Sequence, residues 1–213
     1  FTYYLQEEGP KPWLGVEIQS NQGPWRFEDR YPMTDTTELI WELGSADLAS
    51  AGGGNTIRPD ASSGPVYETP PLEEDLYFGG LPRLHVNVNT ATVGGQIYAL
   101  LEDCDGANCI HIGHAIMDLR YHAGGDDEQT WTPVFEEITA LMEFFPMDVE
   151  VPAGHTIKLT LRSTGEDYLP SAASTLVTVV DAGSTLQLDT FDPETREYYE
   201  TVMCTAQVCK DNL

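Results

Sequence analysis

Residues 68–89 read ETPPLEEDLYFGGLPRLHVNVN and join a proline-rich, acidic approach to a clear strand signal. In residues 84–89 apolar and polar side chains alternate, so that the leucine and the two valines share one face. Such alternation is typical of a strand with one packed and one wet face, as in antiparallel sheets. Residues 70–71 are both proline, which cannot donate to a sheet ladder. We therefore expect an extended approach that ends at Gly79-Gly80, followed by a strand.

The same period-two pattern recurs in residues 157–163, IKLTLRS, and shorter apolar runs are spaced along the chain between Gly and Pro turns. Many short strands separated by turns predict a two-sheet antiparallel arrangement. The expected fold class is therefore all-β, a jelly-roll β-sandwich of the galactose-binding-like kind. The strands that we expect, besides those above, are residues 14–20, 39–43, 96–102, 110–121, 139–150, 156–163, 175–180 and 185–188.

Two segments interrupt this pattern. Residues 44–65, rich in Gly, Ser and Ala, predict a flexible insertion that forms a long surface loop. Near the end, FDPETREYYETVM carries a helix-start signature, because Asp192 can cap, Pro193 suits the first turn and Glu194 favours the helix dipole. We expect a β-sandwich domain over residues 1–190 and a tail with a short C-terminal helix over residues 191–213.

The charge balance excludes several partners. The 213 residues include 35 acidic and 10 basic side chains, a formal net charge of −25. Such a surface repels phosphate backbones and anionic membranes, so we expect no nucleic-acid partner. Membrane insertion is not expected either, because no apolar run approaches the roughly 20 residues that span a bilayer. The acids are spread along the chain, which favours a solvated acidic shell that maintains solubility.

The four cysteines form two pairs with equal spacing, Cys104 with Cys109 and Cys204 with Cys209. An even count in local pairs favours two small disulfide loops and an extracellular or cell-surface location. Free buried thiols are the alternative, and a zinc site is less favoured because the spacing is wider than in zinc knuckles. The second bridge would require the helical tail to end near Met203, because cysteines five apart point in different directions on a helix.

The sequence carries no nucleophile elbow G-x-S-x-G, P-loop, dinucleotide fingerprint or H-E-x-x-H. We predict no catalytic, cofactor-binding or metal-ligating residues. His111 and His114, three apart on an expected strand, should face opposite sides and so cannot share a metal. His155, in the turn PAGHTIKL, is expected to make a structural hydrogen bond.

Calcium and sugar sites are weaker options. Acidic side chains gather at residues 102–105 and 126–128, but neither group has the spacing of a calcium loop, so solvated turns are favoured. Exposed tryptophans could stack on sugar rings, although core packing is the commoner role of this residue. The tryptophans are Trp13, Trp25, Trp41 and Trp131.

Several stretches, in order, resemble one family. ETPPLEEDLYFGGLPRLHVNV is similar to the T-P-P-L-x-x-D-x-x-x-x-G approach to the C-terminal domain of the X-Pro dipeptidyl-peptidase and CocE/NonD hydrolases. VEIQSNQGPWRFEDRYP resembles that family's W-R-x-E-x-x-W-P segment, with Tyr31 where tryptophan is usual. QIYALLEDCDG, IGHAIMDLRYH and VPAGHTIKLTLRST resemble three later strands. The likeness spans about residues 14–190; the cysteine loop at 104–109, the insertion and the tail depart from it.

The resemblance implies a function that composition alone does not. Members are serine hydrolases that release X-Pro dipeptides or cleave esters and amides, with the Ser-Asp-His triad in an N-terminal α/β-hydrolase domain. The expected function is therefore a non-catalytic jelly-roll domain, without a complete active site, that docks on and stabilises that partner domain and walls part of its cleft. The alternatives are a stand-alone carbohydrate- or calcium-binding module and a structural assembly protein.

Overall fold

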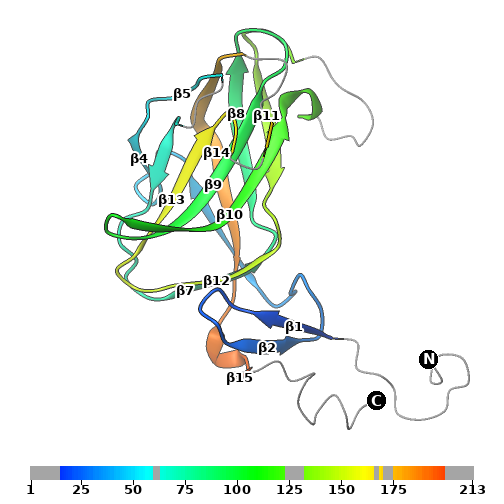
Figure 1. Cartoon of the computed structure of the whole chain (residues 1–213), viewed down its shortest axis with the longest axis vertical. Helices are drawn as coiled ribbons and strands as arrows, with labels where there is room; N and C mark the ends of the chain where they lie inside the picture. The colour runs from blue at the N-terminus through cyan, green and yellow to red at the C-terminus, as the bar shows by residue number, and fades with distance from the viewer. Residues whose placement is uncertain (1–14, 60–62, 123–131, 166–167, 170–174, 200–213) are drawn as a thin grey trace, which may run out of the picture.

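The computed structural model describes residues 15–59, 63–122, 132–165, 168–169 and 175–199. Two antiparallel sheets pack face to face as a sandwich, and a small third sheet lies at one end (Figure 1). The predicted jelly-roll β-sandwich is confirmed.

The first sheet of the sandwich has five strands in the order β10-β9-β13-β6-β4. The central strand β13 pairs with β9 over seven residue pairs, from Thr156 with Cys104 to Arg162 with Tyr98. Alternation in IKLTLRS therefore gives one buried and one outer face, as predicted. The strands are β4 (Ala49–Gly52), β6 (Val66–Glu68), β9 (Gln96–Asp105), β10 (Asn108–Asp118) and β13 (Thr156–Arg162).

The second sheet has seven strands in the order β11-β8-β14-β7-β12, with β3 and β5 also paired to β14. Strand β14 is long enough to pair with β8 on both sides of a register shift between Val180 and Thr185. The strands are β3 (Thr37–Glu42), β5 (Thr56–Ile57), β7 (Leu76–Gly80), β8 (Arg83–Thr90), β11 (Glu137–Glu143), β12 (Met147–Val151) and β14 (Val177–Thr190).

The core lies between these sheets and consists almost entirely of aliphatic and aromatic side chains. Leu84, Val86 and Val88 of the opening stretch are fully buried in it, as their alternation predicts. One polar contact joins the two layers, because the buried Tyr67 of β6 donates a hydrogen bond of 2.6 Å to Asp181 of β14. Burial, reinforced by this carboxylate, raises the pKa of the Tyr67 hydroxyl.

A third sheet of three short strands lies at the end of the sandwich where β7 and β12 run (Figure 1). It consists of β1 (Val16–Gln19), β2 (Trp25–Glu28) and β15 (Tyr198–Tyr199), with β2 in the middle. We call the contact between this sheet and the strands β7 and β12 the junction. The ends of the described chain thus meet in one sheet, although about 170 residues of sandwich lie between them.

The predicted C-terminal helix is wrong over the residues that the structure describes. Asp192 does cap, since its carboxylate accepts a hydrogen bond of 2.9 Å from the backbone N–H of Glu194. The turn that follows is a single 3-10 turn, η2 (Pro193–Thr195), and Arg196 is already extended. Arg196 leaves the helical path because it forms ion pairs with Asp35 and Glu28, and the chain then enters β15. Residues 200–213 lie outside the described part.

Other boundaries also differ from the predictions. The insertion at 44–65 was expected to be a surface loop, but its described residues include β4 and β5, and the side chains of Leu48 and Ile57 are fully buried. The single strand expected at 139–150 is divided into β11 and β12 at Pro146, since proline lacks the N–H that a ladder requires. The two strands expected at 175–188 are parts of one strand, β14.

Candidate functional site

A buried ion cluster forms the centre of the junction. Arg26 of β2 is fully buried, and its guanidinium is 2.7 Å from Glu28 and forms a two-atom hydrogen-bonded pair with Asp148 of β12. Its planar group also lies 4.4 Å from the ring centre of Phe191. Burial by itself lowers the pKa of Arg26, but the hydrogen bonds and charges of Asp148 and Glu28 outweigh it and raise the pKa. The guanidinium of Arg26 therefore stays charged, and its hydrogen bond to Asp148 ties β2 to the sandwich.

Hydrogen bonds from two side chains to the backbone of β7 and β12 surround this ion cluster. The Asn21 side chain accepts from the backbone N–H of Glu150 at 2.8 Å and donates to the Glu150 carbonyl at 3.1 Å, so it pairs with β12 as another strand would. The Tyr31 hydroxyl donates to the Met147 carbonyl at 2.7 Å and accepts from the Gly80 N–H at 2.9 Å. Burial raises the pKa of Tyr31, which keeps this hydroxyl protonated.

The two glycines of the opening stretch allow the small sheet to approach so closely. A Cβ at Gly79 would lie 2.7 Å from the Met33 side chain and 2.9 Å from the Asp148 carboxylate. Gly80 has a φ of +99°, which favours glycine over other residues. Gly79-Gly80 was predicted only to release the chain into a strand, but both residues lie in β7 at the contact with Met33, Tyr31 and Asp148.

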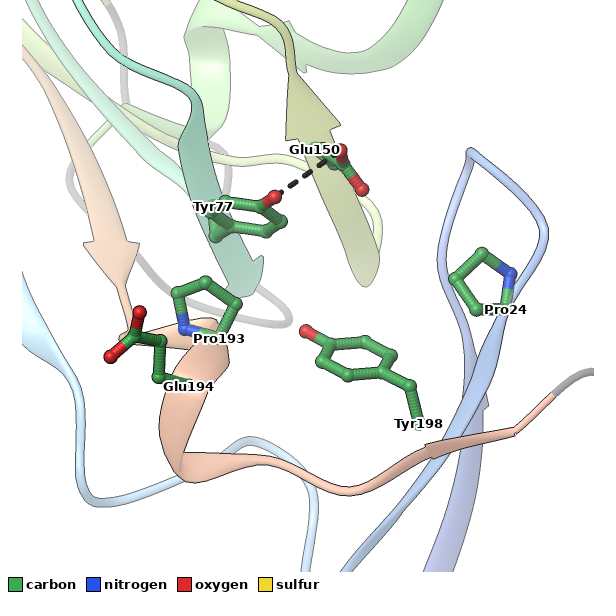
Figure 2. Close-up of a pocket in the computed structure, with 6 residues that line it drawn as sticks. All are labelled: Pro24, Tyr77, Glu150, Pro193, Glu194 and Tyr198. Carbon is green, nitrogen blue, oxygen red and sulfur yellow. Dashed lines mark hydrogen bonds between the residues drawn. The ribbon is translucent and has the colours of Figure 1, made fainter.

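A pocket of about 320 Å³ opens beside the ion cluster, and we call it the junction pocket (Figure 2). Its walls come from the β1–β2 turn, the paired strands β7 and β12, and the segment from η2 to β15. Tyr77 and Glu150 are register partners, and the Tyr77 hydroxyl donates to the Glu150 carboxylate at 3.2 Å. The lining residues are Pro24, Tyr77, Glu150, Pro193, Glu194 and Tyr198.

The electrostatics of this pocket are negative. Partial burial and the neighbouring Glu150 carboxylate raise the pKa of Tyr77 to about 12. Burial also raises the pKa of Tyr198. Both hydroxyls are therefore neutral at physiological pH, and Glu150 and Glu194 carry the charge of the lining.

A second cluster lies on the outer face of the five-stranded sheet, and it corrects a prediction. His111 and His114 were expected on opposite sides of their strand, but a register shift between His111 and Gly113 resets the alternation, so that both face outward. Their ring nitrogens are 3.2 Å apart, and the other nitrogen of His114 is 3.1 Å from the Tyr168 hydroxyl. A β-bulge of this kind has no signal in the sequence that we could use.

Aromatic side chains complete what we call the aromatic–histidine face, defined by Tyr98, His111, His114, Phe145 and Tyr168. The His114 ring stacks on Tyr98 at 5.4 Å and meets the edge of Phe145 at 5.0 Å. Phe145 is 55% exposed, and Leu169, which follows Tyr168, is 89% exposed. This face therefore presents apolar and imidazole groups on a strongly acidic protein.

The other predicted residues have structural roles. Cys104 and Cys109 form a disulfide and face each other across the β9–β10 hairpin, whereas Cys204 and Cys209 lie outside the described residues. The hydrogen bond expected for His155 is present, because its ring lies 2.7 Å from the buried Asp103. Trp41 is buried in the core and Trp25 is half-buried on β2, while Trp13 and Trp131 are outside the described part.

Among the described residues, no group of three or more His, Cys, Asp or Glu side chains could hold a metal ion. Of the acids at 102–105, Asp103 is paired with His155 and Glu102 with Lys158, while residues 126–128 are not described. In the part of the chain that is placed, no helix has the length and apolar character to cross a membrane.

The fold and the junction define the class of the protein: a jelly-roll β-sandwich whose first and last described strands form an added sheet. The family model described as "X-Pro dipeptidyl-peptidase C-terminal non-catalytic domain" matches residues 10–200. The chain therefore belongs to this family, and the resemblance in the sequence is confirmed. A search of the curated proteins finds no match.

Solved structures agree on the fold. An aminopeptidase from a marine sediment Thaumarchaeota archaeon superposes with a TM-score of 0.68 at 11% identity over 90% of this chain. A CocE/NonD family hydrolase from Staphylococcus aureus gives a TM-score of 0.67 at 12% identity, also over 90% of this chain. The chain spans 42% and 44% of the lengths of these two proteins, so it corresponds to one domain of each.

Proposed function

We propose that this chain is the C-terminal domain of a secreted serine hydrolase of the X-Pro-peptidase or CocE/NonD type and docks on an α/β-hydrolase domain of the same protein. The observation that supports this most is the match of a non-catalytic C-terminal domain family to residues 10–200. The related hydrolases have more than half of their length outside the matched region, which is room for a catalytic domain.

The aromatic–histidine face is the docking surface that we favour. Phe145 exposes a large apolar side chain beside His114, and the exposed Leu169 follows Tyr168, whose ring also contacts His114. Exposed apolar groups that gather on one face are a common mark of an interface. None of the five side chains that define the face is acidic, and among the described residues the neighbouring Glu102, opposite His111, has its carboxylate paired with Lys158 at 2.9 Å. A partner surface that contacts these five side chains therefore need not desolvate an unpaired acid.

The disulfide supports the proposed location. The Cys104–Cys109 bridge supports an extracellular or cell-surface protein, since disulfides persist in oxidising compartments. In this proposal the domain contributes no catalytic group. It stabilises the catalytic domain and forms one wall of its cleft.

The test is a pair of variants in the full parent protein. Phe145→Ser with Leu169→Ser should separate the unfolding of the two domains into two calorimetric transitions, because it removes apolar contact between them. Leu141→Ser is the matched control, since Leu141 is 53% exposed but lies on β11 of the other sheet. Docking through this face is wrong if both sets of variants unfold as the parent does. Docking itself is wrong if the unmodified parent already unfolds as two independent domains.

A further inference from the structure

The junction pocket has a lining that suits one class of ligand. Two tyrosine rings and two proline rings supply apolar and π surface, and Glu150 and Glu194 supply negative charge. Among the described residues no cationic side chain lines it, because the nearby Arg26 is buried in its own ion cluster with Asp148 and Glu28. An organic cation on an aliphatic stem is attracted both by carboxylates and by the faces of aromatic rings.

The Tyr198 hydroxyl adds an independent sign of a ligand. Its oxygen is buried and has no hydrogen-bond partner among the residues that the structure describes. Figure 2 shows the Tyr198 side chain extending from β15 toward Tyr77 and Pro193, with its hydroxyl at the pocket. Buried hydroxyls in proteins are nearly always hydrogen-bonded, so this one is open to a polar atom that the described residues do not supply. A hydroxyl oxygen can accept from an ammonium or a guanidinium N–H.

Size limits the ligand further. A volume of about 320 Å³ is at the lower end for small-molecule sites and suits a single long side chain better than a whole substrate. A hydrated metal ion fits less well, because calcium needs six or more oxygen ligands and the walls are largely carbon.

We propose that the junction pocket binds an organic cation, a guanidinium or ammonium group on an aliphatic stem, between Tyr77 and Tyr198 with Glu150 as its counter-charge. Two sources carry this chemistry: an arginine or lysine side chain of the neighbouring catalytic domain, and a free basic peptide. The inference does not depend on which face docks, because the pocket lies at the junction and the docking face lies on the five-stranded sheet.

The direct experiment is a nuclear magnetic resonance titration of this domain with N-acetyl-arginine amide. We expect saturable shifts at Tyr77, Glu150 and Tyr198, with a Kd on the order of 1 mM for so small a ligand. N-acetyl-norleucine amide, which is similar in length but uncharged, should bind at least about tenfold more weakly. Shifts spread over the whole acidic surface, or equal binding of the uncharged amide, would contradict the proposal.

Variants locate the site. Glu150→Gln removes the charge but keeps an acceptor for Tyr77, and we expect it to weaken binding about three- to tenfold. Tyr198→Phe should weaken binding less and leave the fold intact, since its hydroxyl makes no hydrogen bond to any described residue. Glu197→Gln is the control, because Glu197 is exposed on the same segment but does not line the pocket. If Glu150→Gln and Glu197→Gln weaken binding equally, the loss arises from general electrostatics rather than from the pocket, and the proposal is wrong.

The parent protein distinguishes the two sources. If a side chain of the catalytic domain fills the pocket, N-acetyl-arginine amide should bind the isolated domain and fail to bind the parent. If the pocket serves free basic peptides, both should bind with similar affinity. Absence of binding to either form would reject the site.

Discussion

The interior of the sandwich and the junction are both buried, but they are stabilised by different physics. The sandwich core is a continuous cluster of apolar side chains contributed by both sheets. The junction instead depends on Arg26, Glu28 and Asp148, on the Tyr31 hydroxyl and on the Asn21 amide. Apolar burial is spread over many contacts and tolerates change, whereas a buried charge becomes costly as soon as its partner is removed. The small sheet should therefore be the more fragile region to single substitutions.

Arg26→Met should have the largest effect, because it leaves the buried Asp148 without its ion-pair partner and leaves Glu28 with only its 3.4 Å contact to Arg196. Breaking a buried pair in this way costs about 3–5 kcal/mol. We expect the amides of β1, β2 and β15 to lose hydrogen-exchange protection while β8 and β13 keep theirs. Urea denaturation with exchange at single-residue resolution is the measurement.

Two comparisons sharpen this prediction. Arg83→Met is the control, because Arg83 is half-exposed and lies 3.7 Å from Asp189, so its loss should cost at most about 0.5 kcal/mol. Replacing Glu28 and Asp148 by Gln and Asn together with Arg26→Met should restore part of the loss. Uniform loss of protection across the sandwich would show that the junction and the core are one cooperative unit.

Leu159→Ala tests the other region, since Leu159 is fully buried at the centre of β13. Removing a buried leucine side chain costs about 2–5 kcal/mol, depending on how far the site collapses. Here the expected loss is global: β8, β13 and the small sheet should all lose protection together. Retention of the sandwich with local fraying at β13 would contradict the view of one continuous core.

The disulfide should stabilise the sandwich by a smaller amount. Cys104→Ala with Cys109→Ala opens a loop of only a few residues, and the chain-entropy estimate for such a loop is about 2 kcal/mol. The β9–β10 hairpin and β2 lie in different sheets, so removal of the bridge should destabilise the junction only through unfolding of the whole domain. Thermal unfolding of oxidised and alanine-substituted protein measures this. No difference between them would mean that the bridge does not stabilise the domain.

Raising the pH should destabilise the junction more than it destabilises the sandwich core. The pKa of Tyr77 is raised from 10.0 to about 12, and burial also raises the pKa of Tyr31 and Tyr198. The folded chain thus holds these protons at a pH where the unfolded chain releases them. Stability is full below about pH 10 and falls as the pH rises toward 12. Tyr77→Phe should flatten this decline in pH-dependent denaturation, and an unchanged slope would contradict it.

The sandwich could be predicted from sequence because its physics is local and periodic. LHVNVN and IKLTLRS each contain the alternation that one buried face imposes, and both are strands in the structure. Strand boundaries that have no periodic signal were not predicted. Pro146 divides one expected strand into two, and β14 continues through a register shift where two strands were expected. The error at His111 and His114 has the same origin, since a bulge of one residue inverts the alternation that follows.

The junction could not be predicted, because its partners are far apart in the sequence. Arg26 and Asp148 are separated by 122 residues, and the residue type alone does not distinguish a buried arginine from an exposed one. The C-terminal helix was predicted from a correct cap at Asp192, but the ion pairs of Arg196 and the pairing of β15 with β2 overrode that local preference. The family could be predicted from ordered motifs rather than from periodicity, and the family model over residues 10–200 confirms it.

Hydrogen exchange of this domain alone and within its parent hydrolase tests the central proposal, docking on a catalytic domain, most directly. We expect added protection in the parent at residues 111–116, 145 and 168–169, with no change at Leu141 on the opposite sheet. The same protection in both forms along the whole aromatic–histidine face would contradict docking through that surface.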